Sequence, residues 1–102
     1  MTAIFEVLAD ANRRRILDLL RRAERPVGEL VRDLGVSQPA VSKHLRILRE
    51  AGLVDVRSQA QRRLYRINVA PLQAVDEWLA PYRLLWGDRL DDLAAHLDTM
   101  PD

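Results

Sequence analysis

The sequence predicts a mainly helical fold with one small β-hairpin, and three observations lead to this prediction. Apolar residues recur at helical spacing through most of the chain. Glycines and prolines divide these stretches into short helices. One segment, residues 53–67, instead carries two runs that alternate as paired strands do. The 102 residues are enough for one compact domain, or for one domain with an added helix for assembly.

Two helices are expected before Pro26. The first is short and has an apolar side near the N-terminus. Asp10 is a suitable N-cap for the second, residues 11–23, in which isoleucine and leucine recur at helical spacing. Because a proline restricts the residue before it to extended conformations, the Arg25-Pro26 pair should end this second helix.

Two further helices follow, with a turn of three residues between them. Residues 28–34 form a short helix, and Gly35 suits its left-handed C-terminal end. Ser37 then caps a helix that runs to about residue 51. Pro39 lies in the first turn of that helix, where the missing N–H costs nothing. The order helix, glycine turn, helix is therefore expected.

A β-hairpin should follow these helices. Residues 53–57 and 62–67 are predicted as its strands, because their side chains alternate between apolar and polar. Residues 58–61 would join the strands. This tip contains no glycine.

The last third of the chain is expected to be helical. The helical stretch extends from residue 70 to about residue 98, and Pro81 should bend or split it by removing one backbone hydrogen bond. We therefore divide the chain into a first domain, residues 1–68, and a C-terminal helix for dimerisation, residues 69–102.

Composition narrows the class of protein. No apolar run approaches the ~18 residues of a membrane-spanning helix. Near the N-terminus, acidic residues precede the arginines, which is not the order of a secretory signal. The chain has no cysteine, which excludes disulfides and thiolate metal sites and fits a reducing, cytoplasmic location.

The net charge of +1 conceals an uneven distribution. Residues 1–69 carry 14 basic and 8 acidic side chains, whereas residues 70–102 carry 2 and 7. A basic first part is typical of a protein that meets a polyanion. Solvated helix faces are the alternative explanation. All but one of the basic residues are arginines, which suit paired contacts to phosphate and guanine.

The helix that begins after Ser37 has one apolar edge and one polar edge. At 100° per residue, Val41, Leu45 and Leu48 lie within about 60° of one another and form an edge that should be buried. A polar row points away from this edge and consists of Gln38, Ser42, Arg46 and Arg49, with Lys43 beside it. A helix-turn-helix followed by a basic hairpin is the arrangement that inserts one helix into the major groove of DNA.

The residue types in this row suggest separate roles. Gln38, Ser42 and Arg46 are expected to reach bases, because glutamine pairs with adenine, arginine pairs with guanine and serine permits close approach. Lys43 and Arg49 are expected to contact phosphates.

Other polar side chains near this helix need separate interpretations. His44 lies on the buried flank, which favours a hydrogen-bonded structural histidine over one that reads a base. In the hairpin, Arg57, Arg62 and Arg63 flank the tip, and Arg62 and Arg63 are expected to contact the DNA backbone. Arg66 is expected to be solvated.

The chain resembles the ArsR family, the arsenic-repressor-like regulators of prokaryotes. The resemblance lies in the segments LGVSQPAVSKHLRILREAGLV and RRLYRI and in the opening segment LADANRRRILDLL. It covers about residues 5–67, and the terminal segment WLAPYRLLWGDRLDDLAAHL resembles one ArsR subgroup. The chain departs from the family at Ala11, where proline is frequent, and at the hairpin tip, where a glycine is common.

The resemblance implies a winged helix-turn-helix fold with terminal dimerisation helices. Family members are dimeric transcriptional repressors that bind double-stranded DNA, and their first and last helices pack across a two-fold axis. The resemblance puts the family's DNA-contacting positions at Ser37, Gln38, Ser42 and Lys43, and its wing at Arg62 and Arg63. It also raises the question of a signal, because many members release DNA when they bind a metal ion.

A long apolar stripe on the last helix predicts a partner, because a small domain cannot cover so much apolar surface by itself. A homodimer is expected, since two recognition helices must reach successive major grooves about 34 Å apart. The expected interface residues are Ile4, Phe5 and Leu8 in the first helix and Trp78, Tyr82, Leu85, Trp86, Leu90 and Leu93 in the last. Trp78, Tyr82 and Trp86 recur every four residues. We interpret them as interface packing, with a small apolar or aromatic inducer lodged among these rings near Pro81 as the alternative.

Neither a metal nor another cofactor is expected. The candidate metal ligands are Asp88, Asp91, Asp92, His96 and Asp98. Asp92 and His96 have a spacing that can share a metal, but an exposed acidic face is the favoured interpretation.

Catalysis is not expected either, because no glycine-rich phosphate cradle or nucleophile elbow occurs. The function that we expect is a homodimeric repressor bound to an inverted repeat. A winged-helix module that binds another protein is the alternative.

Overall fold

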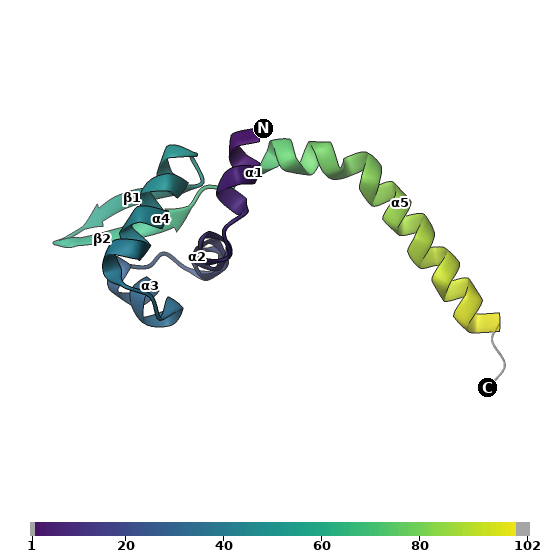
Figure 1. Cartoon of the computed structure of the whole chain (residues 1–102), viewed down its shortest axis with the longest axis horizontal. Coiled ribbons are helices and arrows are strands. Elements are labelled where there is room, and N and C mark those ends of the chain that lie inside the picture. Colours follow the sequence, from purple (N-terminus) through teal and green to yellow (C-terminus); the bar gives the residue numbers. More distant parts are fainter. Residues whose placement is uncertain (1, 100–102) are drawn as a thin grey trace. The chain divides into compact units, whose positions relative to one another are not determined.

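The computed structural model describes the backbone of residues 2–99 and the side chains of residues 3–87, 89 and 93. The elements, in chain order, are α1 (Thr2–Leu8), α2 (Ala11–Arg22), α3 (Val27–Leu34), α4 (Gln38–Glu50), β1 (Val54–Gln59), β2 (Arg62–Ile67) and α5 (Leu72–Thr99) (Figure 1). The prediction of a mainly helical chain with a two-stranded hairpin is confirmed. The chain forms two compact units, Met1–Leu72 and Gln73–Asp102.

Side chains at the helix ends set the limits of α2, α3 and α4. Asp10 caps α2 by accepting hydrogen bonds from the backbone N–H groups of Asn12 and Arg13 at 2.8 and 3.1 Å. Ser37 caps α4 by accepting from the N–H of Ala40. Gly35 ends α3 with a φ of 69°, a left-handed conformation that glycine adopts without a steric penalty. These three ends agree with the sequence prediction.

The core of the first unit forms where α2, α3, α4 and the hairpin meet. Its fully buried side chains are Ile16, Leu30, Val41, Leu45, Leu48, Leu53 and Val54. Each such side chain contributes about 1.5–3 kcal/mol relative to an exposed one. Three of the seven belong to α4, so this helix is held firmly by one edge.

The hairpin is longer than expected, and its turn is tighter. β1 and β2 pair antiparallel from Val54 opposite Ile67 to Gln59 opposite Arg62. Only two residues therefore connect the strands, in place of the four that the sequence suggested. The first of them, Ala60, has a φ of 56°. A two-residue hairpin turn demands this left-handed conformation, which glycine or asparagine usually provides.

A short backbone pairing attaches the hairpin to the connection between α2 and α3. The N–H of Arg25 donates to the carbonyl of Tyr65 at 3.0 Å, and the N–H of Tyr65 donates to the carbonyl of Arg25 at 2.8 Å. Arg25 thus acts as a one-residue third strand beside β2. This pairing fixes the base of the hairpin relative to the helices.

The last helix, α5, continues through Pro81 without interruption. Of the two outcomes expected for Pro81, a split does not occur, and the ribbon of α5 changes direction along its length (Figure 1). A proline in a helix removes one hydrogen bond but does not have to end the helix. Within the described residues, no helix is both long and apolar enough to cross a membrane.

We expect Ala60→Gly to raise the free energy of unfolding by up to about 1 kcal/mol, because glycine adopts a positive φ without the clash of a Cβ atom. Urea denaturation of the two proteins measures this difference. Gln61→Gly is the matched control at the neighbouring turn position, and it should bring no gain. A lower stability of Ala60→Gly would contradict the strain argument.

Candidate nucleic-acid interface

The polar row of α4 is exposed along its whole length. Val41, Leu45 and Leu48 have 1% or less of their surface exposed. The opposite edge is open to solvent and carries Gln38, Ser42, Lys43, Arg46 and Arg49, as well as the N-cap residue Ser37. α4 packs against α3, to which the glycine turn connects it, and against β1 of the hairpin. The structure therefore presents a helix-turn-helix whose second helix has a free polar edge beside a basic hairpin.

The hairpin carries four exposed arginines, Arg57, Arg62, Arg63 and Arg66, and Arg62 and Arg63 are the two that stand next to the tip. Arg62 lies opposite Gln59, and Arg63 lies opposite Ser58. Because successive side chains of a strand point to opposite faces, the two guanidinium groups serve opposite faces of the hairpin.

Arg57 has a different role from the two tip arginines. Its Nε donates to the Oε2 atom of Glu24 at 2.5 Å, and Glu24 belongs to the connection between α2 and α3. This contact reinforces the attachment that Arg25 and Tyr65 make through their backbones. Arg57 is therefore engaged in an ion pair at the protein surface, and no local sequence pattern distinguishes it from Arg62 and Arg63.

The consecutive arginines at the start of α2 face other helices of the domain. Arg13 donates to the carbonyls of Val7 and Glu6, and Arg14 donates to that of Leu8. Arg15 donates, at longer distances, to carbonyls at the end of α3. The last carbonyls of a helix have no partner within that helix, so a cation there stabilises its end. Three of the 14 basic side chains of residues 1–69 thus hold helix ends, a role that the charge distribution did not indicate.

His44 connects α4 to the start of α2. Its side chain is 15% exposed, its Nδ1 lies 3.4 Å from Nη1 of Arg13, and its Nε2 lies 4.0 Å from Oδ1 of Asp10. The interpretation of His44 as a hydrogen-bonded structural histidine is confirmed.

The pKa of Asp10 lies below its ordinary value of 3.8, chiefly because the carboxylate accepts the backbone N–H of Arg13. Partial burial opposes this lowering of the pKa, and the charge of His44, the N–H of Asn12 and the charge of Arg13 add to it. The ionised carboxylate is thus the form that caps α2.

Known proteins share this arrangement. Residues 10–56 match the family model described as bacterial regulatory protein, arsR family. The HTH-type transcriptional regulator Rv2034 of Mycobacterium tuberculosis is 45% identical over 98 residues, which cover 96% of this chain and 89% of the relative. The chain belongs to the ArsR family. It is a DNA-binding transcriptional regulator, and not an enzyme.

Two more proteins match most of this chain. The transcriptional repressor SdpR of Bacillus subtilis is 32% identical over 79 residues, which cover 78% of this chain and 88% of SdpR. The homodimeric winged helix-turn-helix DNA-binding domain of Mb0332 from Mycobacterium bovis has a TM-score of 0.63 and 28% identity. The match covers 89% of this chain and 82% of that one. The winged helix-turn-helix prediction is therefore confirmed.

The second unit of this ArsR-family chain exposes a row of large apolar side chains along α5. Trp78, Tyr82, Leu85, Trp86 and Leu93 each have 45–59% of their surface exposed. The rings of Trp78 and Tyr82 are tilted by 49°, with their centroids 5.1 Å apart. At 100° per residue these side chains share one face of the helix.

Not every expected interface residue is equally available. In α1, Phe5 is 38% exposed and Leu8 is half-buried, but Ile4 is only 9% exposed. Ile4 packs within the first unit, which differs from the expectation that it faces a partner. The side chain of Leu90 lies outside the described residues.

The metal hypothesis depends on side chains that the structure does not describe, namely those of Asp88, Asp91, Asp92, His96 and Asp98. Among the described side chains, no cluster of three or more histidine, aspartate or glutamate residues is suited to hold a metal ion.

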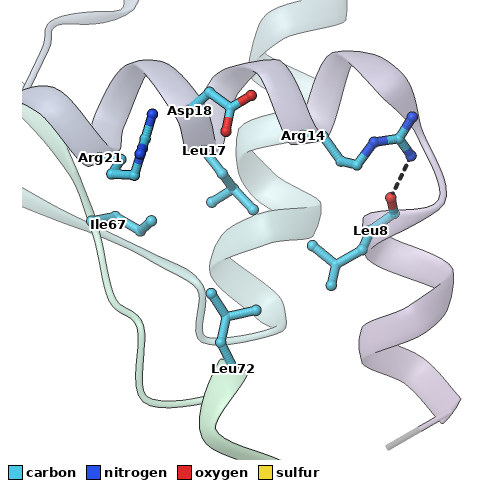
Figure 2. A pocket seen from close by; sticks show the side chains of 7 residues that line it. All are labelled: Leu8, Arg14, Leu17, Asp18, Arg21, Ile67 and Leu72. Carbon is cyan, nitrogen blue, oxygen red and sulfur yellow. Dashed lines mark hydrogen bonds between the residues drawn. The ribbon is translucent and has the colours of Figure 1, made fainter. Parts of the chain in front are cut away.

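The aromatic side chains line neither of two surface hollows. Figure 2 shows one of about 310 Å³, formed by apolar side chains of Leu8, Leu17, Ile67 and Leu72 and by the charged residues Arg14, Asp18 and Arg21. An open hollow beside Pro81 is lined by Glu77, Ala80, Arg83 and Leu84 as well as the proline. Neither hollow supports an inducer held among the three rings.

We expect the free-energy difference of unfolding between the wild type and Asp10→Asn to depend on pH. Asparagine keeps the capping oxygen but not the charge. Because the folded pKa of Asp10 is lowered, its contribution is fully present above pH values near 3.8 and is lost as the pH falls through the folded pKa. Urea denaturation at pH 6 and at about pH 3 should show the advantage of the wild type shrinking. An advantage that stays constant would contradict this role.

Proposed function

We propose that this ArsR-family regulator is a homodimeric repressor that binds an inverted-repeat operator. The observation that carries the proposal is the exposed polar row of α4, opposite an edge that is almost completely buried. A helix held in this way can enter a major groove without losing its attachment to the domain. The transcriptional repressor SdpR, which is 32% identical to this chain, supports repression as the mode of regulation. A regulator of this kind works in the cytoplasm, where the bacterial chromosome lies.

The roles of the individual residues follow from their positions on α4. Gln38, Ser42 and Arg46 read base edges, because they occupy the first turns and the middle of the exposed row. Lys43 and Arg49 lie beside them and contact phosphates. The hydroxyl oxygen of Ser37 accepts the capping hydrogen bond from the N–H of Ala40. The hydroxyl proton therefore remains available to a phosphate at the positive end of α4.

The tip of the hairpin contacts the neighbouring backbone of the DNA. Arg62 and Arg63 are exposed and have no acidic residue opposite them in the strand pairing. Since their side chains serve opposite faces, one of the two points toward the duplex in any single docking orientation.

A second copy of the chain covers the apolar face of α5. Two recognition helices must reach successive major grooves, about 34 Å apart, and a homodimer provides this spacing. The exposed aromatic row would be an unusual surface on a monomer of this size. The homodimeric Mb0332 domain supports the same assembly.

Selection of bound fragments from random duplexes tests operator binding. The wild type should enrich an inverted repeat, and its affinity for that duplex should fall steeply with salt as phosphate contacts release counterions. Gln38→Ala and Arg46→Ala should each lose about 1–3 kcal/mol of discrimination at one base position per half-site. Binding that does not depend on salt, or no enrichment at all, would exclude the proposal.

The hairpin offers a matched pair of arginines for the backbone contacts. The double variant Arg62→Ala/Arg63→Ala should have a shallower dependence of affinity on salt concentration, by the equivalent of about one phosphate contact per half-site. Arg57→Ala should leave the slope unchanged, because Arg57 is engaged with Glu24. An equal change in salt dependence for Arg57→Ala and for the variant that lacks Arg62 and Arg63 would mean that the hairpin does not contact the duplex as proposed.

The face of α5 that forms the dimer can be tested by charge insertion. Trp86→Glu should convert the dimer into monomers in sedimentation experiments, because it buries an unpaired charge in the interface. Leu84→Glu is the control, since Leu84 lies about 200° around the helix from Tyr82 and should leave the dimer intact. A dimer that survives Trp86→Glu would place the interface elsewhere.

A further inference from the structure

Arg13 lies in the first turn of α2 and is bonded to the end of α1. Its Nε donates to the carbonyl of Val7 at 2.6 Å, and its Nη2 donates to the carbonyl of Glu6 at 3.2 Å. Its own backbone N–H donates to the capping carboxylate of Asp10. These bonds hold the guanidinium group in one orientation, because both its backbone and its side chain are engaged.

The same guanidinium group reaches the recognition helix. Its Nη1 lies 3.4 Å from Nδ1 of His44, in the middle of α4. Since an arginine can only donate, Nδ1 must accept, and His44 then carries its proton on Nε2. That nitrogen faces Oδ1 of Asp10 at 4.0 Å. The hydrogen bond from Arg13 is thus the polar contact that ties His44 to the α2 N-terminus, and the carboxylate of Asp10 lies near the other ring nitrogen without bonding it.

The contact matters because the other attachment of α4 is apolar. Burial of Val41, Leu45 and Leu48 holds the helix strongly, but apolar contacts have little directional preference. Hydrogen bonds depend on angle and distance and therefore define a rotation about the helix axis. His44 lies two residues from Ser42 and two from Arg46, so a rotation at His44 moves both side chains relative to a groove.

We propose that Arg13 is a positioning residue for DNA reading, which acts through His44 to set the orientation of α4 relative to α1 and α2. The proposal rests on the function proposed above. In this proposal Arg13 makes no contact with the duplex, since each of its three side-chain nitrogens is already engaged within the protein. Its loss should therefore lower the preference for the correct sequence without changing the number of phosphate contacts.

The test compares Arg13→Gln with Arg14→Gln. Arg14 is the matched control, because it carries the same charge on the same helix and donates to the carbonyl of Leu8 at the end of α1. The affinity for the duplex that the wild type selects, and for a shuffled duplex of equal length, is measured at two salt concentrations. Both variants are kept at a temperature at which circular dichroism shows them folded.

Arg13→Gln should reduce the ratio of the two affinities by about tenfold, the loss expected for one charge-assisted hydrogen bond, with an unchanged salt slope. Arg14→Gln should keep the wild-type ratio. A purely structural role of Arg13 would lower thermal stability and leave the ratio of the folded protein unchanged. Equal ratios for the two variants would overturn the proposal.

Substitutions of His44 test the other end of the same contact. His44→Asn keeps an acceptor near the position of Nδ1 and should retain the ratio, whereas His44→Leu removes the acceptor and should lower it as Arg13→Gln does. The double variant Arg13→Gln/His44→Leu should lose no more than either single variant, since both remove one interaction. Additive losses would overturn the proposal. If Arg13→Gln does not fold, the comparison of His44→Asn with His44→Leu decides the question, and equal ratios for these two variants would overturn the proposal.

Failure of the proposed function gives a different result. In that case the wild type itself selects no duplex and shows no salt-dependent affinity. If the wild type binds its selected duplex and Arg13→Gln shows the same ratio of affinities as the wild type, only the positioning role is wrong.

Discussion

The structure depends on a division of α4 into an edge that must be buried and an edge that must remain free. Val41, Leu45 and Leu48 remove one edge from water almost completely, and every residue of the polar row stays exposed. Replacing one of these buried leucines with alanine typically costs about 2–5 kcal/mol, a large part of the stability of a small domain. The recognition surface is therefore supported by the same helix that completes the core.

Arginine serves two purposes in this chain, and position in the fold separates them. Arg13, Arg14 and Arg15 hold the C-terminal ends of helices, and Arg57 forms an ion pair with Glu24. The arginines of α4 and of the hairpin tip are exposed and remain available to a polyanion. Net charge alone therefore overstates the charge that is free to meet a polyanion, because a guanidinium bonded to carbonyls within the protein has fewer N–H groups left for a phosphate.

The hairpin is fixed at its base and strained at its tip. The paired backbones of Arg25 and Tyr65 anchor it to the connection between α2 and α3. At the other end, Ala60 takes a conformation that costs a residue with a Cβ atom about 1 kcal/mol or more. The tight turn brings Arg62 and Arg63 next to the tip. The missing glycine thus does not prevent a two-residue turn, since the strand pairing compensates for the strain.

Local patterns were enough to predict the caps at Asp10 and Ser37, the glycine end of α3 and the buried edge of α4, because each depends on residues within one or two turns of the chain. The bonds of Arg13, the pairing of Arg57 with Glu24 and the burial of Ile4 within its own unit could not be predicted in this way. Arg57 and Glu24 are 33 positions apart, and Arg13 and His44 are 31 apart. Which distant groups meet depends on how the helices pack, since neither periodicity nor composition records the partner of a long polar side chain.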